Sequence, residues 1–119
     1  MKVFLVEDSP LLRSRLEAML SSIPGASVVG HAESADEAID GIRATAPDAV
    51  VLDLGLRSGN GFDVLRAAAA PSPQIAFYVL TNHPIDAFRA AAQRLGARGF
   101  FDKSTEFEAL KAALAGLAR

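Results

Sequence analysis

Cysteine and tryptophan are absent from this 119-residue chain, and tyrosine occurs once. The lack of cysteine excludes disulfides and thiolate metal sites, and it fits a reducing compartment. No apolar run approaches the roughly 20 residues of a membrane span, and the one before Glu7 is too short for a secretory signal. The net charge is −2 and there is no basic cluster, so we expect this chain to contact neither membrane nor nucleic acid.

The sequence does contain a regular alternation of apolar runs and helical patterns. Half of its residues are hydrophobic, and the length suits one domain with a real core. The expected strands are Lys2–Glu7, Ser27–His31, Asp48–Asp53, Gln74–Leu80 and Gly99–Phe101. Because these runs alternate with helical segments, the pattern predicts βαβ units and a parallel sheet with helices on both faces.

Each of the five expected helices has a signal at its start. These signals are Pro10, the pair Ser34 and Glu37, Phe62 after a glycine-rich loop, Pro84, and the pair Thr105 and Glu108. A proline suits the first helical turn, and a hydroxyl followed three residues later by a glutamate is typical of a capping box. In the fourth helix, the spacing predicts that Ile85 and Phe88 face inward.

Polar side chains follow four of the expected strands. Glu7 and Asp8 come after the first, Asp53 closes the third, Thr81 follows the fourth and Lys103 comes after the fifth. In open α/β sheets, ligands bind outside the carboxyl ends of the strands. We therefore expect a flavodoxin-like, doubly wound (βα)5 fold, with strand order 2-1-3-4-5, that brings these groups together at one edge.

Three crowded carboxylates would repel one another unless a proton or a divalent cation lies among them. Oxygen-only ligands favour Mg²⁺. The candidate metal ligands are the side chains of Glu7, Asp8 and Asp53 and the carbonyl of Gly55. A carboxylate can attack a phosphoryl group, while Lys103 would hold a phosphoryl oxygen as a point charge and Thr81 would donate a hydrogen bond to another.

Each of these residues alone has a simpler interpretation. Asp53 by itself is as often a turn or cap residue, Thr81 would be a helix-start hydroxyl, and Lys103 would be a solvated surface charge. The ordered set, with polar groups after four strands, is what favours a functional site.

The set resembles the receiver domain of two-component response regulators over the whole chain, residues 1–119. The matching segments are Phe4–Asp8, Val50–Asp53 with Gly61 eight residues on, Leu80-Thr81 and Gly96–Lys103. The resemblance implies that a sensor histidine kinase or a phosphotransfer protein phosphorylates Asp53. It also implies that Glu7, Asp8 and the Gly55 carbonyl hold Mg²⁺ with Asp53, and that Lys103 binds the phosphoryl group.

The resemblance further implies a conformational switch formed by Thr81 and Phe100, in which Phe100 rotates inward from the strand surface. The fourth helix, fifth strand and fifth helix would then form a face for a homodimer or a protein partner. We expect a cytoplasmic phosphoacceptor with at most slow self-catalysed phosphorylation and dephosphorylation. The segment Thr81-Asn82-His83 looks like the subgroup with helix-turn-helix output, and no output domain lies within these 119 residues.

Three positions depart from the commonest receiver pattern. Arg57 stands where a proline is usual in the loop after the phosphoacceptor, Asn82 where a very small residue is frequent, and Ser104 where proline is common. The loop geometry and the lifetime of the phosphorylated state depend on these positions.

A Mg²⁺-dependent phosphatase with an aspartate nucleophile is the main alternative. Phosphatases of the haloacid-dehalogenase type carry a second acid two residues after the nucleophile to protonate the leaving group, and here that position is Gly55. A flavin-binding module is permitted by the same fold. However, the chain has little for ring stacking, and its carboxylates would repel a flavin phosphate.

Overall fold

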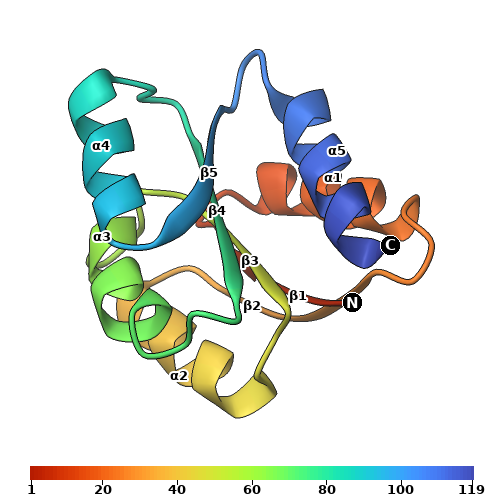
Figure 1. Ribbon diagram of the computed structural model, residues 1–119, viewed down its shortest axis with the longest axis horizontal. Coiled ribbons are helices and arrows are strands. Elements are labelled where there is room, and N and C mark those ends of the chain that lie inside the picture. The colour runs from red at the N-terminus through yellow and green to blue at the C-terminus, as the bar shows by residue number, and fades with distance from the viewer.

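A computed structural model describes all residues, 1–119, and has a single five-stranded sheet in the order β2-β1-β3-β4-β5 (Figure 1). The strands are β1 (Lys2–Val6), β2 (Ser27–Ala32), β3 (Ala49–Leu52), β4 (Ala76–Thr81) and β5 (Ala97–Asp102). All four neighbouring pairs are parallel. The predicted flavodoxin-like fold and strand order are therefore confirmed.

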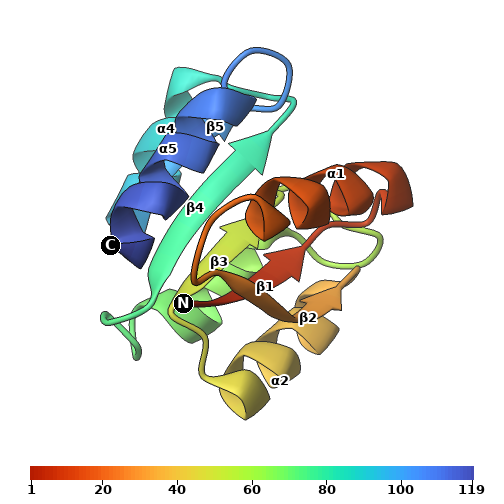
Figure 2. The same ribbon diagram turned by 90° about the vertical axis from the view of Figure 1, so that its right-hand side faces the viewer.

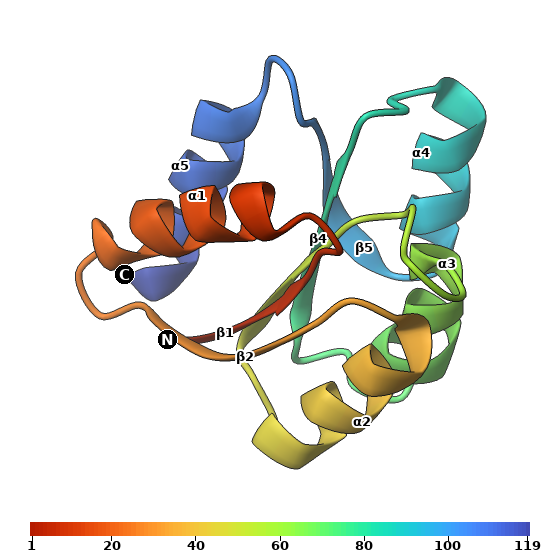
Figure 3. The same cartoon turned by 180° about the vertical axis from the view of Figure 1, so that it is seen from behind.

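Helical segments cover both faces of the sheet. They are α1 (Pro10–Ser21), α2 (Ala35–Thr45), α3 (Gly61–Val64), the π-helix η1 (Leu65–Ala69), α4 (Asp86–Arg94) and α5 (Phe107–Ala118). Helices α1 and α5 lie on one face, and α2, α3 and α4 lie on the other (Figures 1 and 3). Figure 2 looks onto the face covered by α1 and α5. No helix combines the length and apolarity needed to cross a membrane.

Each face has its own hydrophobic core. Successive strand residues point to opposite faces, so Val50 and Leu52 join the core under α2, α3 and α4, whereas Val51 joins the core under α1 and α5. Every residue of β3 and β4 is buried. Full burial of such a side chain contributes about 1.5–3 kcal/mol, so these central strands hold the sheet edge that carries the polar residues in place.

Helix starts match the sequence signals in part. The Ser34 hydroxyl accepts from the N–H of Glu37 at 3.4 Å as expected, but the Glu37 carboxylate returns to the Ser34 hydroxyl at 3.0 Å and not to the backbone. The predicted box of Thr105 and Glu108 is wrong: α5 begins at Phe107 and has no side-chain cap. Its preceding residue, Glu106, instead accepts from the N–H of Asp102 at 3.0 Å.

The segment before α4 also differs from the prediction. Ile85 has an extended backbone, so α4 begins at Asp86, two residues after Pro84. As a result Ile85 is 50% exposed and the inward prediction for it is wrong, whereas Phe88 packs against the core as expected. Strand β4 starts at Ala76, two residues later than predicted, and β5 starts at Ala97, two residues earlier.

The third helix begins at Gly61 with a capping box that the sequence analysis missed. Asn60 and Asp63 each accept a hydrogen bond from the other's backbone N–H, both at 3.1 Å. The alanine run then continues as the π-helix η1 and not as a plain α-helix. The cap fixes where the loop after β3 ends, which matters for the site described below.

Candidate functional site

The strand register places the polar residues side by side at the carboxyl edge of the sheet. Val6 pairs with Leu52, and the N–H of Asp53 donates to the Val6 carbonyl at 2.9 Å, so Glu7 and Asp53 leave the sheet next to each other. On the other side, the N–H of Lys103 donates to the Thr81 carbonyl at 2.9 Å.

The three carboxylates predicted to form a cluster do so. One oxygen each from Glu7, Asp8 and Asp53 lie within 4.8 Å of one another. Glu7 is 2% exposed and Asp53 is 7% exposed, whereas Asp8 is exposed to solvent. The cluster therefore has a buried floor and one open side, through which a small charged ligand can enter.

Lys103 joins two of these carboxylates. Its amine lies 2.8 Å from Asp53 Oδ2 and 3.0 Å from Glu7 Oε1. Burial alone would lower the pKa of Lys103, but the hydrogen bonds to Asp53 and Glu7 and the negative charges of both together outweigh burial and raise the pKa above its ordinary value. The amine thus stays protonated and holds a fixed positive charge against the nucleophile candidate.

The carboxyl of Glu7 is buried beside the carboxylate of Asp53. Burial raises the pKa of its carboxyl above the ordinary value of 4.5, and the charge of Asp53 adds to the effect. The hydrogen bonds from the Ser9 N–H, at 3.0 Å, and from Lys103 only partly oppose this rise. A second cation beside Glu7 would relieve the penalty, and an all-oxygen donor set suits Mg²⁺. The residues present fit that ion.

Short contacts within the loop after Asp53 tie it to Asp53. The Gly55 N–H donates to Asp53 Oδ1 at 3.3 Å, and Gly55 forms an antiparallel bridge with Asn60. A Cβ atom built at Gly61 would lie 2.5 Å from the Asp53 carbonyl oxygen, so only glycine allows the chain to pass this close. This contact explains why Gly61 stands eight residues after Asp53.

The two switch candidates are both buried. The Thr81 hydroxyl is fully buried and accepts from the N–H of His83 at 3.1 Å. Phe100 is 5% exposed, so its ring has the inward orientation of the expected switch, and the rotation itself stays a prediction. Phe100 belongs to the core under α2, α3 and α4, and Arg89 of α4 also contacts it: the guanidinium lies 4.7 Å from the ring centre and donates to the Phe100 carbonyl at 3.2 Å. The sequence analysis missed this role of Arg89.

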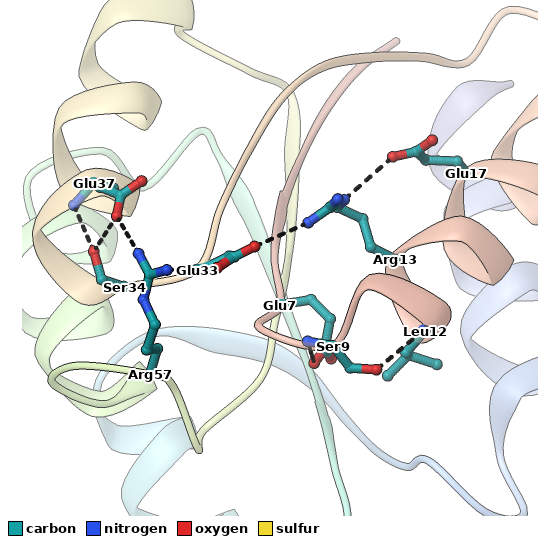
Figure 4. A network of polar contacts seen from close by, with 9 residues as sticks. All are labelled: Glu7, Ser9, Leu12, Arg13, Glu17, Glu33, Ser34, Glu37 and Arg57. Atoms are coloured by element: carbon teal, nitrogen blue, oxygen red, sulfur yellow. Dashed lines mark hydrogen bonds and ion pairs between the residues drawn. The ribbon is translucent and has the colours of Figure 1, made fainter.

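The departures from the receiver pattern lie around the rim. Asn82 and Ser104, with Lys103, line an open cavity of about 370 Å³ between α1 and the loops after β4 and β5. Arg57 points away from this cavity toward α2 and forms ion pairs with Glu33 and Glu37 (Figure 4). Neither arrangement was predicted, because both depend on residues far apart in the sequence.

Known proteins share both the sequence pattern and the fold. Residues 3–115 match the family model of the response regulator receiver domain. The chain is 36% identical over 102 residues to the DNA-binding transcriptional activator DevR/DosR of Mycobacterium tuberculosis, covering 86% of this chain and 47% of that protein. It is also 36% identical over 105 residues to protein-glutamate methylesterase/protein-glutamine glutaminase 2 of Vibrio vulnificus, covering 87% and 30%.

A solved structure gives the same result. The signal receiver domain of the response regulator NarL from Mycobacterium tuberculosis matches with a TM-score of 0.85 at 30% identity, over 98% of this chain and 94% of that one. The chain spans less than half of the length of the two relatives above. Receiver domains are in general not enzymes, although the Vibrio relative is named as one. With the family match and this geometry together, the chain belongs to the receiver domains of two-component response regulators.

Proposed function

We propose that Asp53 is the residue that accepts a phosphoryl group in this receiver domain. The observation that carries the proposal is the contact of Lys103 with Asp53 Oδ2 at 2.8 Å, within a cluster that also holds Glu7 and Asp8. Asp53 directly follows β3, the middle strand of the five, and its side chain contacts the amine while lying within the carboxylate cluster. The donor would be a sensor histidine kinase or a phosphotransfer protein in the cytoplasm.

Asp8, Asp53 and the Gly55 carbonyl would hold Mg²⁺ directly, and Glu7 would act through water, because this ion commonly uses only one or two carboxylates and keeps several waters. When bound, the ion neutralises negative charge on the phosphoryl oxygens.

The chain's own residues account for the transfer. A carboxylate oxygen of Asp53 forms a bond to phosphorus while the bond from phosphorus to the donor nitrogen breaks, and the donor imidazole leaves with the electron pair and takes up a proton. Lys103 then holds a phosphoryl oxygen in place of its present partner. Thr81 accepts one hydrogen bond and donates none, so its hydroxyl proton is available for another phosphoryl oxygen.

Slow self-catalysed loss of the phosphoryl group is part of the proposal, but turnover of phosphate esters is not. Gly55 offers no acid to protonate a leaving alcohol, which argues against the phosphatase alternative. The output would lie in another domain or partner, reached through the face of α4, β5 and α5 by dimerisation or docking. DNA binding is the output named for DevR/DosR, and control of transcription is our proposal for the protein that contains this domain.

Intact-mass measurement after incubation with acetyl phosphate and Mg²⁺ tests the proposal. We expect one added phosphoryl group that is lost in Asp53→Asn and is labile to hydroxylamine, as an acyl phosphate is. Asp40→Asn, an exposed acid of α2, is the matched control and should be labelled like the wild type. Persistent labelling of Asp53→Asn would overturn the assignment of Asp53.

A further inference from the structure

Charged side chains of alternating sign form a continuous row at the carboxyl edge of the sheet (Figure 4). We call it the charge ladder, and its members in order are Glu17, Arg13, Glu33, Arg57 and Glu37. It joins three elements that are distant in sequence: α1, the start of α2 with the residue before its cap, and the loop between β3 and α3.

The two arginines contribute unequally to the ladder. Arg13 lies 3.5 Å from Glu33 Oε1 and 3.7 Å from Glu17 Oε1, and its buried Nη1 forms no hydrogen bond. Arg57 makes shorter pairs, 2.9 Å to Glu33 Oε2 and 3.1 Å to Glu37 Oε1, from separate nitrogens of one guanidinium. Contacts to two different carboxylates, one of them a hydrogen bond to Glu37, restrain the position of the guanidinium. Arg57 is therefore the member that holds a loop in position.

The backbone around Arg57 is tied to the same element. Its N–H donates to the Glu33 carbonyl at 3.1 Å, and the next carbonyl, of Ser58, accepts from the N–H of Ala35 at 3.0 Å. The loop between Asp53 and the cap at Asn60 is thus attached at its midpoint to the start of α2 by two backbone bonds and two ion pairs.

This attachment lies close in sequence to the metal ligands of the proposed function. Gly55 is two residues before Arg57, so their Cα atoms are at most about 7 Å apart. The Gly55 N–H already contacts Asp53 Oδ1 at 3.3 Å. Movement of Arg57 would move the Gly55 carbonyl, and a ligand displaced by more than about 0.5 Å no longer suits a metal site.

We propose that Arg57, held by Glu33 and Glu37, is a positioning residue that sets the Mg²⁺ affinity of the site by fixing the Gly55 carbonyl. Arg57 stands where a proline is usual in receivers, and in this chain its ion pairs would restrain the loop at that position. The proposal rests on the proposed function, since that function supplies the ion. Arg57 is 61% exposed at its side chain, so added salt should weaken its effect.

A purely electrostatic role for Arg57 predicts the opposite result. Removing a positive charge from the surroundings of three carboxylates strengthens the binding of a cation, whereas loosening the loop weakens it. The sign of the change in Mg²⁺ dissociation constant therefore separates the two roles. Arg66 is a matched control, because its side chain is 60% exposed and pairs with Asp63 at 3.1 Å within α3 and η1.

The test is an amide NMR titration with MgCl₂ on the wild type, Arg57→Ala, Glu33→Gln, the double variant and Arg66→Ala. We expect Arg57→Ala to raise the Mg²⁺ dissociation constant about three- to tenfold. The expected change is small for a residue that acts through a metal ligand, because the ion pairs of Arg57 are exposed. Glu33→Gln should have a smaller effect in the same direction, and the double variant should be no worse than Arg57→Ala. Arg66→Ala should bind as the wild type does.

A second readout needs no metal. In EDTA, amide hydrogen exchange at Gly55 and Arg57 should be faster in Arg57→Ala and unchanged in Arg66→Ala. Unchanged or tighter Mg²⁺ binding by Arg57→Ala, with unchanged exchange, would overturn the positioning role and leave the proposed function intact. A wild-type chain that binds no Mg²⁺ at millimolar concentrations would instead contradict the proposed function.

Discussion

Arg89 covers Phe100 with its guanidinium 4.7 Å from the ring centre and binds the carbonyl of the same residue at 3.2 Å. These two contacts add to the core packing that holds Phe100 in its buried orientation. Phe100 has no hydroxyl, so packing and this one arginine must hold the ring.

We predict that Arg89→Gln frees the Phe100 ring. A cation–π contact of this kind contributes about 0.5–2 kcal/mol, enough to shift a two-state equilibrium by up to about thirtyfold. Aromatic NMR should show exchange broadening or new shifts for Phe100 in the variant. Arg15→Gln is the control, since Arg15 lies 4.8 Å from the ring centre of Phe107. If Phe100 shifts equally in both variants, the specific role of Arg89 is wrong.

Replacement of Lys103 tests the charge balance of the site. Lys103→Met leaves Glu7 and Asp53 buried without their cation, which we expect to lower the free energy of unfolding by about 3 kcal/mol in EDTA at pH 8. The pKa of Lys103 is raised, so its stabilisation is complete below its ordinary pKa and is lost only as the pH rises through the folded value. Urea denaturation at pH 8 measures this loss.

The loss should be smaller near pH 5, because Glu7 can then take up a proton in the variant. Lys103→Arg, which keeps the charge, should be far less destabilised at either pH. Equal losses at pH 5 and pH 8 would show that packing, and not charge, accounts for the effect.

The raised pKa of Glu7 predicts how stability depends on pH in the absence of metal. Burial raises this pKa above 4.5, so the related stability is fully present below 4.5 and is lost as the pH rises through the folded value. Glu7→Gln does not titrate, and its free energy of unfolding relative to the wild type should therefore increase between pH 4 and pH 8 in EDTA. Glu108→Gln, an exposed acid of α5, should give no such slope.

Asp8 should matter for metal binding and hardly at all for folding. It is exposed, and α1 is capped by Ser9, whose hydroxyl accepts from the Leu12 N–H at 3.3 Å. We expect Asp8→Ala to abolish Mg²⁺ binding and phosphorylation together, while the unfolding free energy in EDTA changes by no more than about 0.5 kcal/mol. Phosphorylation of this variant at the normal rate with Mg²⁺ would contradict the metal assignment.

The sheet and the convergence of the site were predictable because both follow from local patterns. An apolar run such as Val50–Leu52 has to be buried on both faces of a sheet. Because the strands are parallel, the residues that follow each strand lie at the same carboxyl edge of the sheet. That rule brings Glu7, Asp53 and Lys103 together without any knowledge of the helices. The Ser34 cap was predictable for a similar reason, since its partner is three residues away.

What failed depends on contacts between distant segments. The pair Thr105 and Glu108 has the spacing of a capping box. In the structure, however, the side chain of Glu106, the residue before α5, accepts a hydrogen bond from the backbone N–H of Asp102. The contact of Arg89 with Phe100 joins two residues that are eleven apart and lie on different elements. The pairing of Arg57 with Glu33 spans two loops whose approach only the folded sheet defines. Spacing along the chain contains no information on such pairs.

Strand β5 lies at the edge of the sheet, and this position bears on how phosphorylation of Asp53 would affect both faces of the domain. Its only hydrogen-bonded neighbour is β4, so it can shift without disturbing the other strands. Its adjacent residues Phe100 and Phe101 pack into opposite cores, one beside α4 and the other beside Tyr78 and α5 (Figure 1). A small displacement of this strand would therefore change the packing on both faces of the sheet, so in our proposal one phosphorylation event could alter two separate surfaces of the domain.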